Sequence, residues 1–83
     1  MTVASSKAHA TELLDLRGLK CPLPALFARR ALERSNPGTP VEILADDPMA
    51  IADVPHMCRQ EGYGVLSAER EGDESRFILR RSG

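Results

Sequence analysis

The chain has 83 residues, enough for one small domain with a modest core and too few for a second domain or a large pocket. Its 11 basic and 12 acidic residues nearly cancel, and with no Trp, one Tyr and two Phe it lacks aromatic stacking groups. Direct nucleic-acid binding, which needs a basic face or such groups, is therefore not expected, and no apolar segment is long enough to cross a membrane.

The first ten residues have the composition of a polar tail. Residues 1–10 include Lys7 and His9 but no continuous apolar run, which argues against a secretory signal. We expect a flexible N-terminal tail over 1–10 and a single domain over 11–83. The two cysteines form neither a disulfide framework nor a paired metal motif. Free thiols persist in reducing compartments, so we expect a cytoplasmic protein with no metal site.

A strand and a helix are predicted first. The strand is the short apolar segment Glu12–Leu16. The helix runs from Pro22 to about Arg34, since proline in the first helical turn has no intrahelical hydrogen bond to lose. Its expected core face follows the i, i+3, i+4 spacing and consists of Phe27, Ala28, Ala31 and Leu32.

Cys21 precedes Pro22 and therefore stands at the expected N-cap of this helix. A helix N-terminus favours a negative charge by about 0.3–1 kcal/mol, or about 2 kcal/mol in a partly buried site. Together with Lys20, this predicts a lowered pKa of the thiol and a nucleophilic thiolate. Pro22 and Pro24 stiffen the turn and hold the sulfur outward. The alternative is an ordinary buried cysteine in a loop that starts a helix.

Four residues of this helix are candidates for docking a partner. Leu23 and Leu26 fall outside the core face, so they form either an apolar patch beside the thiol or a contact with the preceding loop. Arg29 and Arg30 either meet an acidic partner surface or are ordinary solvated helix arginines.

A second strand and a second helix follow. Asn36-Pro37-Gly38 ends the first helix, and Val41–Ala45 is a strand, which implies a parallel, right-handed crossover. The next helix begins at Pro48 with Asp47 as its cap. The adjacent carboxylates of Asp46 and Asp47 could instead indicate metal or acid–base chemistry, but no further ligand stands in a fixed relation to them.

Pro55 in the second helix predicts a bend or a restart, with Asp53 capping the second part. One face of this helix should lie in the core, and it contains Ile51, Val54, Pro55 and Cys58. Cys58 is thus interpreted as a small buried residue, since acting as a resolving cysteine for Cys21 would require it to turn outward. His56 is expected to face solvent.

The last part of the chain predicts a hairpin. Gly62-Tyr63-Gly64 closes the helix, and the strands Val65–Glu71 and Ser75–Arg81 flank a turn that contains Gly72. The predicted fold is an α/β two-layer sandwich of order β-α-β-α-β-β, with two helices on one face of a mixed four-stranded sheet.

The segment Leu16–Pro24 resembles the signature of the TusA-like (SirA-type) sulfur-carrier family, a CPxP motif after a Gly-Leu-x turn. The resemblance spans about Leu13 to Arg81 and implies the same fold. Other segments at the family's expected places are Asn36-Pro37-Gly38, Ala45-Asp46-Asp47-Pro48, Asp53-Val54-Pro55-His56-Met57-Cys58 and Glu61-Gly62-Tyr63.

This resemblance implies a sulfurtransferase. Members take sulfane sulfur from a donor, such as a cysteine desulfurase or a rhodanese, hold it as a persulfide on the CPxP cysteine, and pass it to an acceptor protein. Here that cysteine is Cys21, supported by Gly18, Lys20, Pro22 and Pro24. We expect a monomer that needs no cofactor and turns over no small molecule on its own. Transfer RNA thiolation, molybdenum-cofactor assembly and sulfur oxidation all stay open as pathways.

Two other functions stay open. One is a regulatory or nucleic-acid-associated module, because some relatives were described as regulators and the fold resembles an RNA-associated initiation-factor domain. The near-neutral charge weighs against it. The other is a thiol redox switch, with Cys21 oxidised to sulfenic acid or paired with Cys58.

Overall fold

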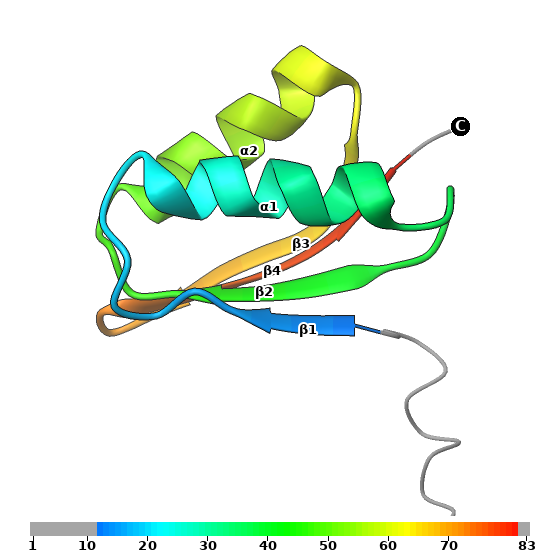
Figure 1. Cartoon of the computed structure of the whole chain (residues 1–83). Coiled ribbons are helices and arrows are strands. Elements are labelled where there is room, and N and C mark those ends of the chain that lie inside the picture. Colours follow the sequence, from blue (N-terminus) through cyan, green and yellow to red (C-terminus); the bar gives the residue numbers. More distant parts are fainter. Residues whose placement is uncertain (1–11, 82–83) are drawn as a thin grey trace, which may run out of the picture.

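The computed structural model describes residues 12–81, and the tail expected over 1–10 lies outside these residues. The order of elements is β-α-β-α-β-β, and both helices lie on one side of the sheet (Figure 1). The elements are β1 (Glu12–Asp15), α1 (Leu23–Arg34), β2 (Val41–Ala45), α2 (Ala50–Glu61), β3 (Gly64–Glu71) and β4 (Glu74–Arg80). The predicted two-layer α/β sandwich is confirmed.

The sheet is mixed, as predicted, with the strand order β1-β2-β4-β3. β1 pairs in parallel with β2, whereas β4 pairs antiparallel with both β2 and β3. Alternate residues of the two central strands point toward the helices, because side chains alternate between the faces of a strand. Those facing residues are fully buried and comprise Val41, Ile43, Ala45, Phe77 and Leu79.

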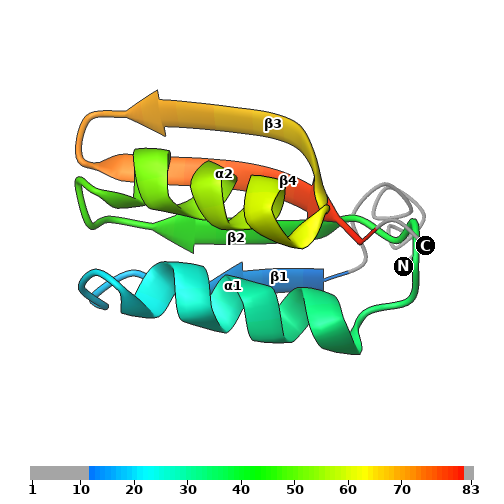
Figure 2. The ribbon, with the colours of Figure 1, turned by 90° about the horizontal axis from the view of Figure 1, so that it is seen from above.

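The two helices cover different strands, and this determines what is buried. In the view from above, α1 lies over the β1 side of the sheet and α2 over the central strands, while β3 extends beyond both helices (Figure 2). The helices contribute fully buried Ala28, Leu32, Val54 and Cys58 to the core. Phe27 and Ala31, expected in the same core, are only partly buried. On β3, which lies at the edge of the sheet, Leu66 stays 50% exposed.

The start of α2 differs from the prediction. The helix begins at Ala50 instead of Pro48, because a tight turn precedes it. In this turn the Met49 N–H donates to Asp47 Oδ1 (3.2 Å), and the Ala50 N–H donates to the Asp47 carbonyl (2.9 Å). Asp47 therefore closes the turn, and Met49 occupies the N-cap position without a side-chain cap.

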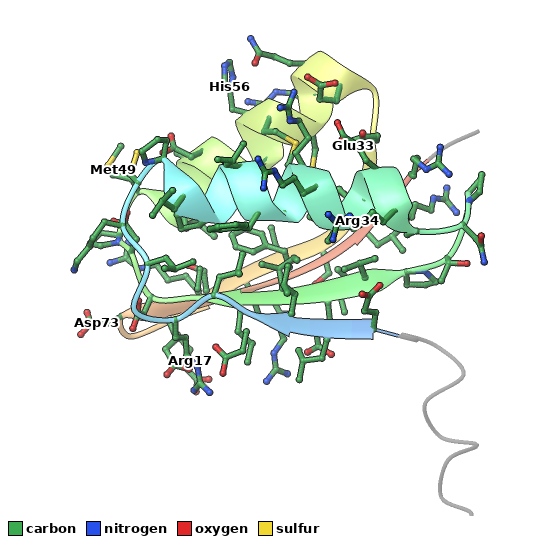
Figure 3. All side chains as sticks on the ribbon, viewed as in Figure 1. Arg17, Glu33, Arg34, Met49, His56 and Asp73 are labelled. Atoms are coloured by element: carbon green, nitrogen blue, oxygen red, sulfur yellow. The ribbon has the colours of Figure 1, made fainter. Side chains whose placement is uncertain are left out.

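The sequence predicted a bend or a restart of α2, and the restart with Asp53 as its cap was wrong. The helix is one continuous element with Pro55 inside it, and the Asp53 N–H donates to the Met49 carbonyl as in an ordinary first turn. Met57 is buried on the core face, while Pro55 is only half-buried. His56 is exposed, as predicted (Figure 3).

Smaller differences concern the ends of the strands. β1 stops at Asp15 instead of Leu16, although Leu16 is buried. β3 starts one residue early, at Gly64, and β4 spans Glu74–Arg80 instead of Ser75–Arg81. These shifts of one residue leave the hairpin and its turn as predicted.

Candidate functional site: a thiol at the end of the sheet

The topology brings together two connections that are far apart in the sequence. Cys21 lies between β1 and α1, and Asp47 lies between β2 and α2. Because β1 and β2 are parallel, their carboxyl ends emerge at the same edge of the sheet. Figure 1 shows both connections at the left end of the molecule. The loop that carries the cysteine is therefore next to the start of α2.

Two carboxylates hold the cysteine loop in place. The Gly18 N–H donates to Asp46 Oδ1 (2.9 Å), and the Cys21 N–H donates to Asp47 Oδ2. Asp47 is only 6% exposed, so its negative charge is held by backbone N–H groups of this loop and of the turn before α2. Gly18 has a φ of +92°, a conformation that glycine adopts without the steric cost of a side chain.

Cys21 is exposed but does not cap α1. The N-cap is Pro22, the helix begins at Leu23, and no side chain makes a cap hydrogen bond. The Leu23 N–H first closes a turn onto the Lys20 carbonyl (2.8 Å), and the Leu26 N–H then makes its bond to the Pro22 carbonyl (3.2 Å). This turn places Cys21 one residue before the cap, so the predicted cap position was wrong.

The electrostatic environment of Cys21 also differs from the prediction. The Cys21 thiol donates a hydrogen bond to Asp53 Oδ2, with Sγ and Oδ2 2.9 Å apart. This bond is the largest cause of a raised pKa of Cys21, followed by desolvation and by the charges of Asp53 and Asp47. The sequence predicted a lowered pKa, but a full carboxylate charge in contact outweighs the partial charge of about half an electron at a helix end.

The candidate docking residues differ in how available they are. Leu23 is 37% exposed, whereas Leu26 is half-buried. Arg29 lies 3.9 Å from a Glu33 oxygen and 3.8 Å from a Glu61 oxygen, and Arg30 lies over the Phe27 ring, 6.0 Å from its centroid. A docking role for these residues stays a prediction.

Sequence reasoning missed three residues at this end of the molecule. Asp47 and Asp53 were interpreted as helix caps and were not placed beside Cys21, although both contact it. Met49 is 53% exposed at the N-cap of α2, two residues after Asp47 (Figure 3), and adds an exposed apolar side chain at the start of this helix. For Asp47 the signal was available, because an acidic residue that directly follows a strand parallel to β1 must lie near the loop that leaves β1.

Two hollows in the surface lie away from the thiol. One, of about 220 Å³, separates β1 from α1 and is lined by Leu14, Phe27 and Arg30, among others. The other, of about 100 Å³, lies beside the β3–β4 turn. Cys21 lines neither of them. It is exposed on its loop, where another macromolecule can reach the sulfur.

Neither a metal-ligand cluster nor a membrane-spanning helix occurs among residues 12–81. Over residues 12–81, no group of three or more His, Cys, Asp or Glu side chains is arranged to hold a metal ion. No helix in this range combines the length and the apolar character that a membrane span needs.

The fold and the site together define a small α/β domain that presents one thiol at the end of its sheet. The family model of the sulfurtransferase TusA matches residues 12–81, and the chain therefore belongs to this family. The crystal structure of a SirA-like protein from Desulfitobacterium hafniense superposes with a TM-score of 0.71 at 23% identity, covering 88% of this chain and all of that one. The resemblance noted from the sequence is thus confirmed, and the solved structure supports the fold.

Proposed function

We propose that this protein is a sulfur carrier, which accepts sulfane sulfur as a persulfide on Cys21 from a donor protein and relays it to an acceptor protein. The observation that carries the proposal is a free, exposed cysteine in a member of the TusA sulfurtransferase family. Exchange of sulfur between proteins depends on access to the thiol and on its thiolate fraction, and it needs no enclosed substrate pocket.

The proposed chemistry is balanced without an outside oxidant. Cys21 Sγ, as the thiolate, attacks the terminal sulfur of the donor's persulfide. The donor's S–S bond breaks, the donor cysteine leaves as a thiolate with the electron pair, and Cys21–S–SH forms. One S–S bond is made and one is broken, so the step involves no net oxidation. An acceptor thiolate then attacks the terminal sulfur of Cys21–S–SH in the same way, and Cys21 leaves as the thiolate.

The surroundings of Cys21 supply the supporting roles in this proposal. Gly18 and Pro22 shape the loop that exposes the sulfur, and Lys20 is the neighbouring cation. Pro24 is buried in the first turn of α1, so it supports the start of the helix and not the loop. Leu23 is the most exposed of the predicted docking residues that are apolar, and it offers a donor or acceptor an apolar contact beside the thiol. The carrier requires no cofactor of its own, and a reducing cytoplasm would keep its thiol free.

Intact-protein mass spectrometry tests the proposal directly. The protein is incubated with a cysteine desulfurase and free cysteine, or in a second arm with a rhodanese and thiosulfate. We expect the mass to rise by one sulfur atom, to return on treatment with a reductant, and to stay unchanged in Cys21→Ser. Cys58→Ala is the matched control and should load as the wild type does. No adduct in either arm, or full loading of Cys21→Ser, would overturn the carrier function.

A further inference from the structure

The hydrogen bond between Cys21 and Asp53 joins the loop before α1 to the first turn of α2. Asp53 lies in the first turn of α2, and its own N–H is already bonded within the helix. Among residues 12–81, the hydrogen bond recorded for its carboxylate comes from the Cys21 thiol, 2.9 Å away. Because the site is partly exposed and Asp53 is half-buried, the bond is neither a core contact nor a freely solvated pair.

The charges around the sulfur are mainly negative. Asp53 contacts Sγ from α2, and Asp47, from the turn before α2, accepts the Cys21 backbone N–H. Asp46 binds the same loop through Gly18. The basic group next to Cys21 in the sequence is Lys20, an exposed side chain whose charge is screened by water. A thiolate formed on Sγ would therefore face a carboxylate at contact distance.

We propose that Asp53 sets the reactivity of Cys21: its carboxylate accepts the thiol hydrogen and opposes negative charge on Sγ, which slows sulfur exchange with small thiols. The inference rests on the proposed carrier function and assigns it a positioning residue. The hydrogen bond that holds the Cys21 thiol in place thus also lowers its reactivity.

The restraint applies to the loaded protein as well as to the empty one. When a small thiolate attacks the terminal sulfur of Cys21–S–SH, the bond between Sγ and that sulfur breaks, and Sγ takes the electron pair. The attacking thiol leaves as a persulfide, and Sγ becomes a thiolate beside Asp53. A leaving group with a higher pKa leaves more slowly, so Asp53 helps the carrier to keep its sulfur. The raised pKa of the Cys21 thiol agrees with this role.

The effect of removing the charge at Asp53 scales with the change that this causes in the pKa of Cys21. Each unit by which the pKa of Cys21 falls raises the thiolate fraction about tenfold near neutral pH. It also lowers the intrinsic nucleophilicity about threefold, given a Brønsted coefficient of about 0.4–0.5. The net expectation is an alkylation rate at pH 7 about threefold higher per unit.

The first experiment measures the rate of Cys21 alkylation by iodoacetamide from pH 6 to pH 10, with the modified site assigned by peptide mass spectrometry. Asp53→Asn should move the midpoint to lower pH and raise the rate at pH 7 above that of the wild type. Glu61→Gln is the matched control, because it removes one negative charge from the same helix about 12 Å further along its axis. Asp53→Ala repeats the test without an amide side chain, and circular dichroism checks that each variant is folded.

The second experiment loads the wild type and Asp53→Asn with sulfur and follows its loss to glutathione by intact mass. We expect faster loss from Asp53→Asn. A pH profile unchanged in both folded Asp53 variants, or an equal shift in Glu61→Gln, would overturn the inference. If the alkylation profile shifts but no donor loads the wild type, the carrier function fails while the control of the thiol by Asp53 stands.

Discussion

The two cysteines of this chain show how the same side chain acquires opposite properties. Cys21 is exposed on a loop at the end of the sheet, whereas Cys58 is fully buried on the core face of α2. Both thiols have a raised pKa, but the causes differ. For Cys21 the first cause is the hydrogen bond to Asp53, and for Cys58 it is burial, which raises the pKa to about 11.

Because of this difference, the reactivity of Cys21 can be controlled by its surroundings, whereas Cys58 is inert in the folded protein. Burial removes Cys58 from every reagent, and only unfolding restores its reactivity. A hydrogen bond to a carboxylate leaves Cys21 accessible, and in our proposal a change in the charge of that carboxylate changes the reactivity of the thiol. The reactive site therefore depends on a polar contact, and the structural site depends on packing.

The largest expected effect is on chemical modification of the native protein. Iodoacetamide should modify Cys21 at least about 1,000-fold faster than Cys58, because Cys58 reacts only after an opening that costs several kcal/mol. Peptide mass spectrometry on samples quenched over time measures both rates. Denaturation in urea should abolish most of the difference. Comparable rates in the folded protein would show that Cys58 is not part of a closed core.

The next effect is on stability. Cys58→Ser should lower the free energy of unfolding by about 1–3 kcal/mol, because it buries a hydroxyl in an apolar site. Cys21→Ser, the matched exposed substitution, should change it by less than about 0.5 kcal/mol. Urea unfolding followed by circular dichroism gives both values. If the two variants are equally stable, burial of Cys58 contributes nothing particular to the fold.

A related effect concerns alkaline pH. The pKa of Cys58 is raised from an ordinary value of 9.0 to about 11 in the folded protein. The unfolded state therefore loses this proton first, and stability decreases as the pH rises from about 9 to about 11. The loss attributable to Cys58 is about 1–3 kcal/mol. Tyr63, whose pKa is also raised by burial, acts in the same direction.

Comparison with Cys58→Ala isolates the contribution of the thiol, since Tyr63 and the other groups titrate in both proteins. Urea unfolding is measured at pH 8, 9 and 10. The wild type should lose more stability over this range than the variant does. Parallel curves for the two proteins would contradict the raised pKa of Cys58.

The sequence predicted the fold well because its signals were local and mutually consistent. The prolines before α1 and α2, the glycine after α2 and the apolar residues of β2 each indicated one element, and the parallel crossover followed from their order. The predicted face of α2 correctly included Val54 and Cys58. The boundary at Ala50 was missed because the turn that precedes it is stabilised by the Asp47 side chain.

The candidate site was predicted less completely, since it depends on contacts between distant segments. The exposure of Cys21 agrees with the predicted presentation of a thiol, but the sign of the pKa change does not. From the local sequence, the only charges that could be considered near the Cys21 thiol were the helix end and Lys20. The charge of Asp53 could not be included, because Asp53 lies 32 residues further along the chain and reaches Sγ only after α2 docks on the sheet.

At the end of the molecule opposite Cys21, hydrogen bonds of Arg81 hold the end of β4 to the segment after α1. The Arg81 guanidinium donates to the Ser35 carbonyl (2.7 and 3.2 Å) just after α1, and the Gly38 N–H donates to the Arg81 carbonyl (2.7 Å). Cys21 stands before the other end of α1, a helix about 18 Å long. A tether or a reporter group attached beyond Arg81 would therefore leave the sulfur uncovered, and the domain could be held by one end while it is loaded at the other.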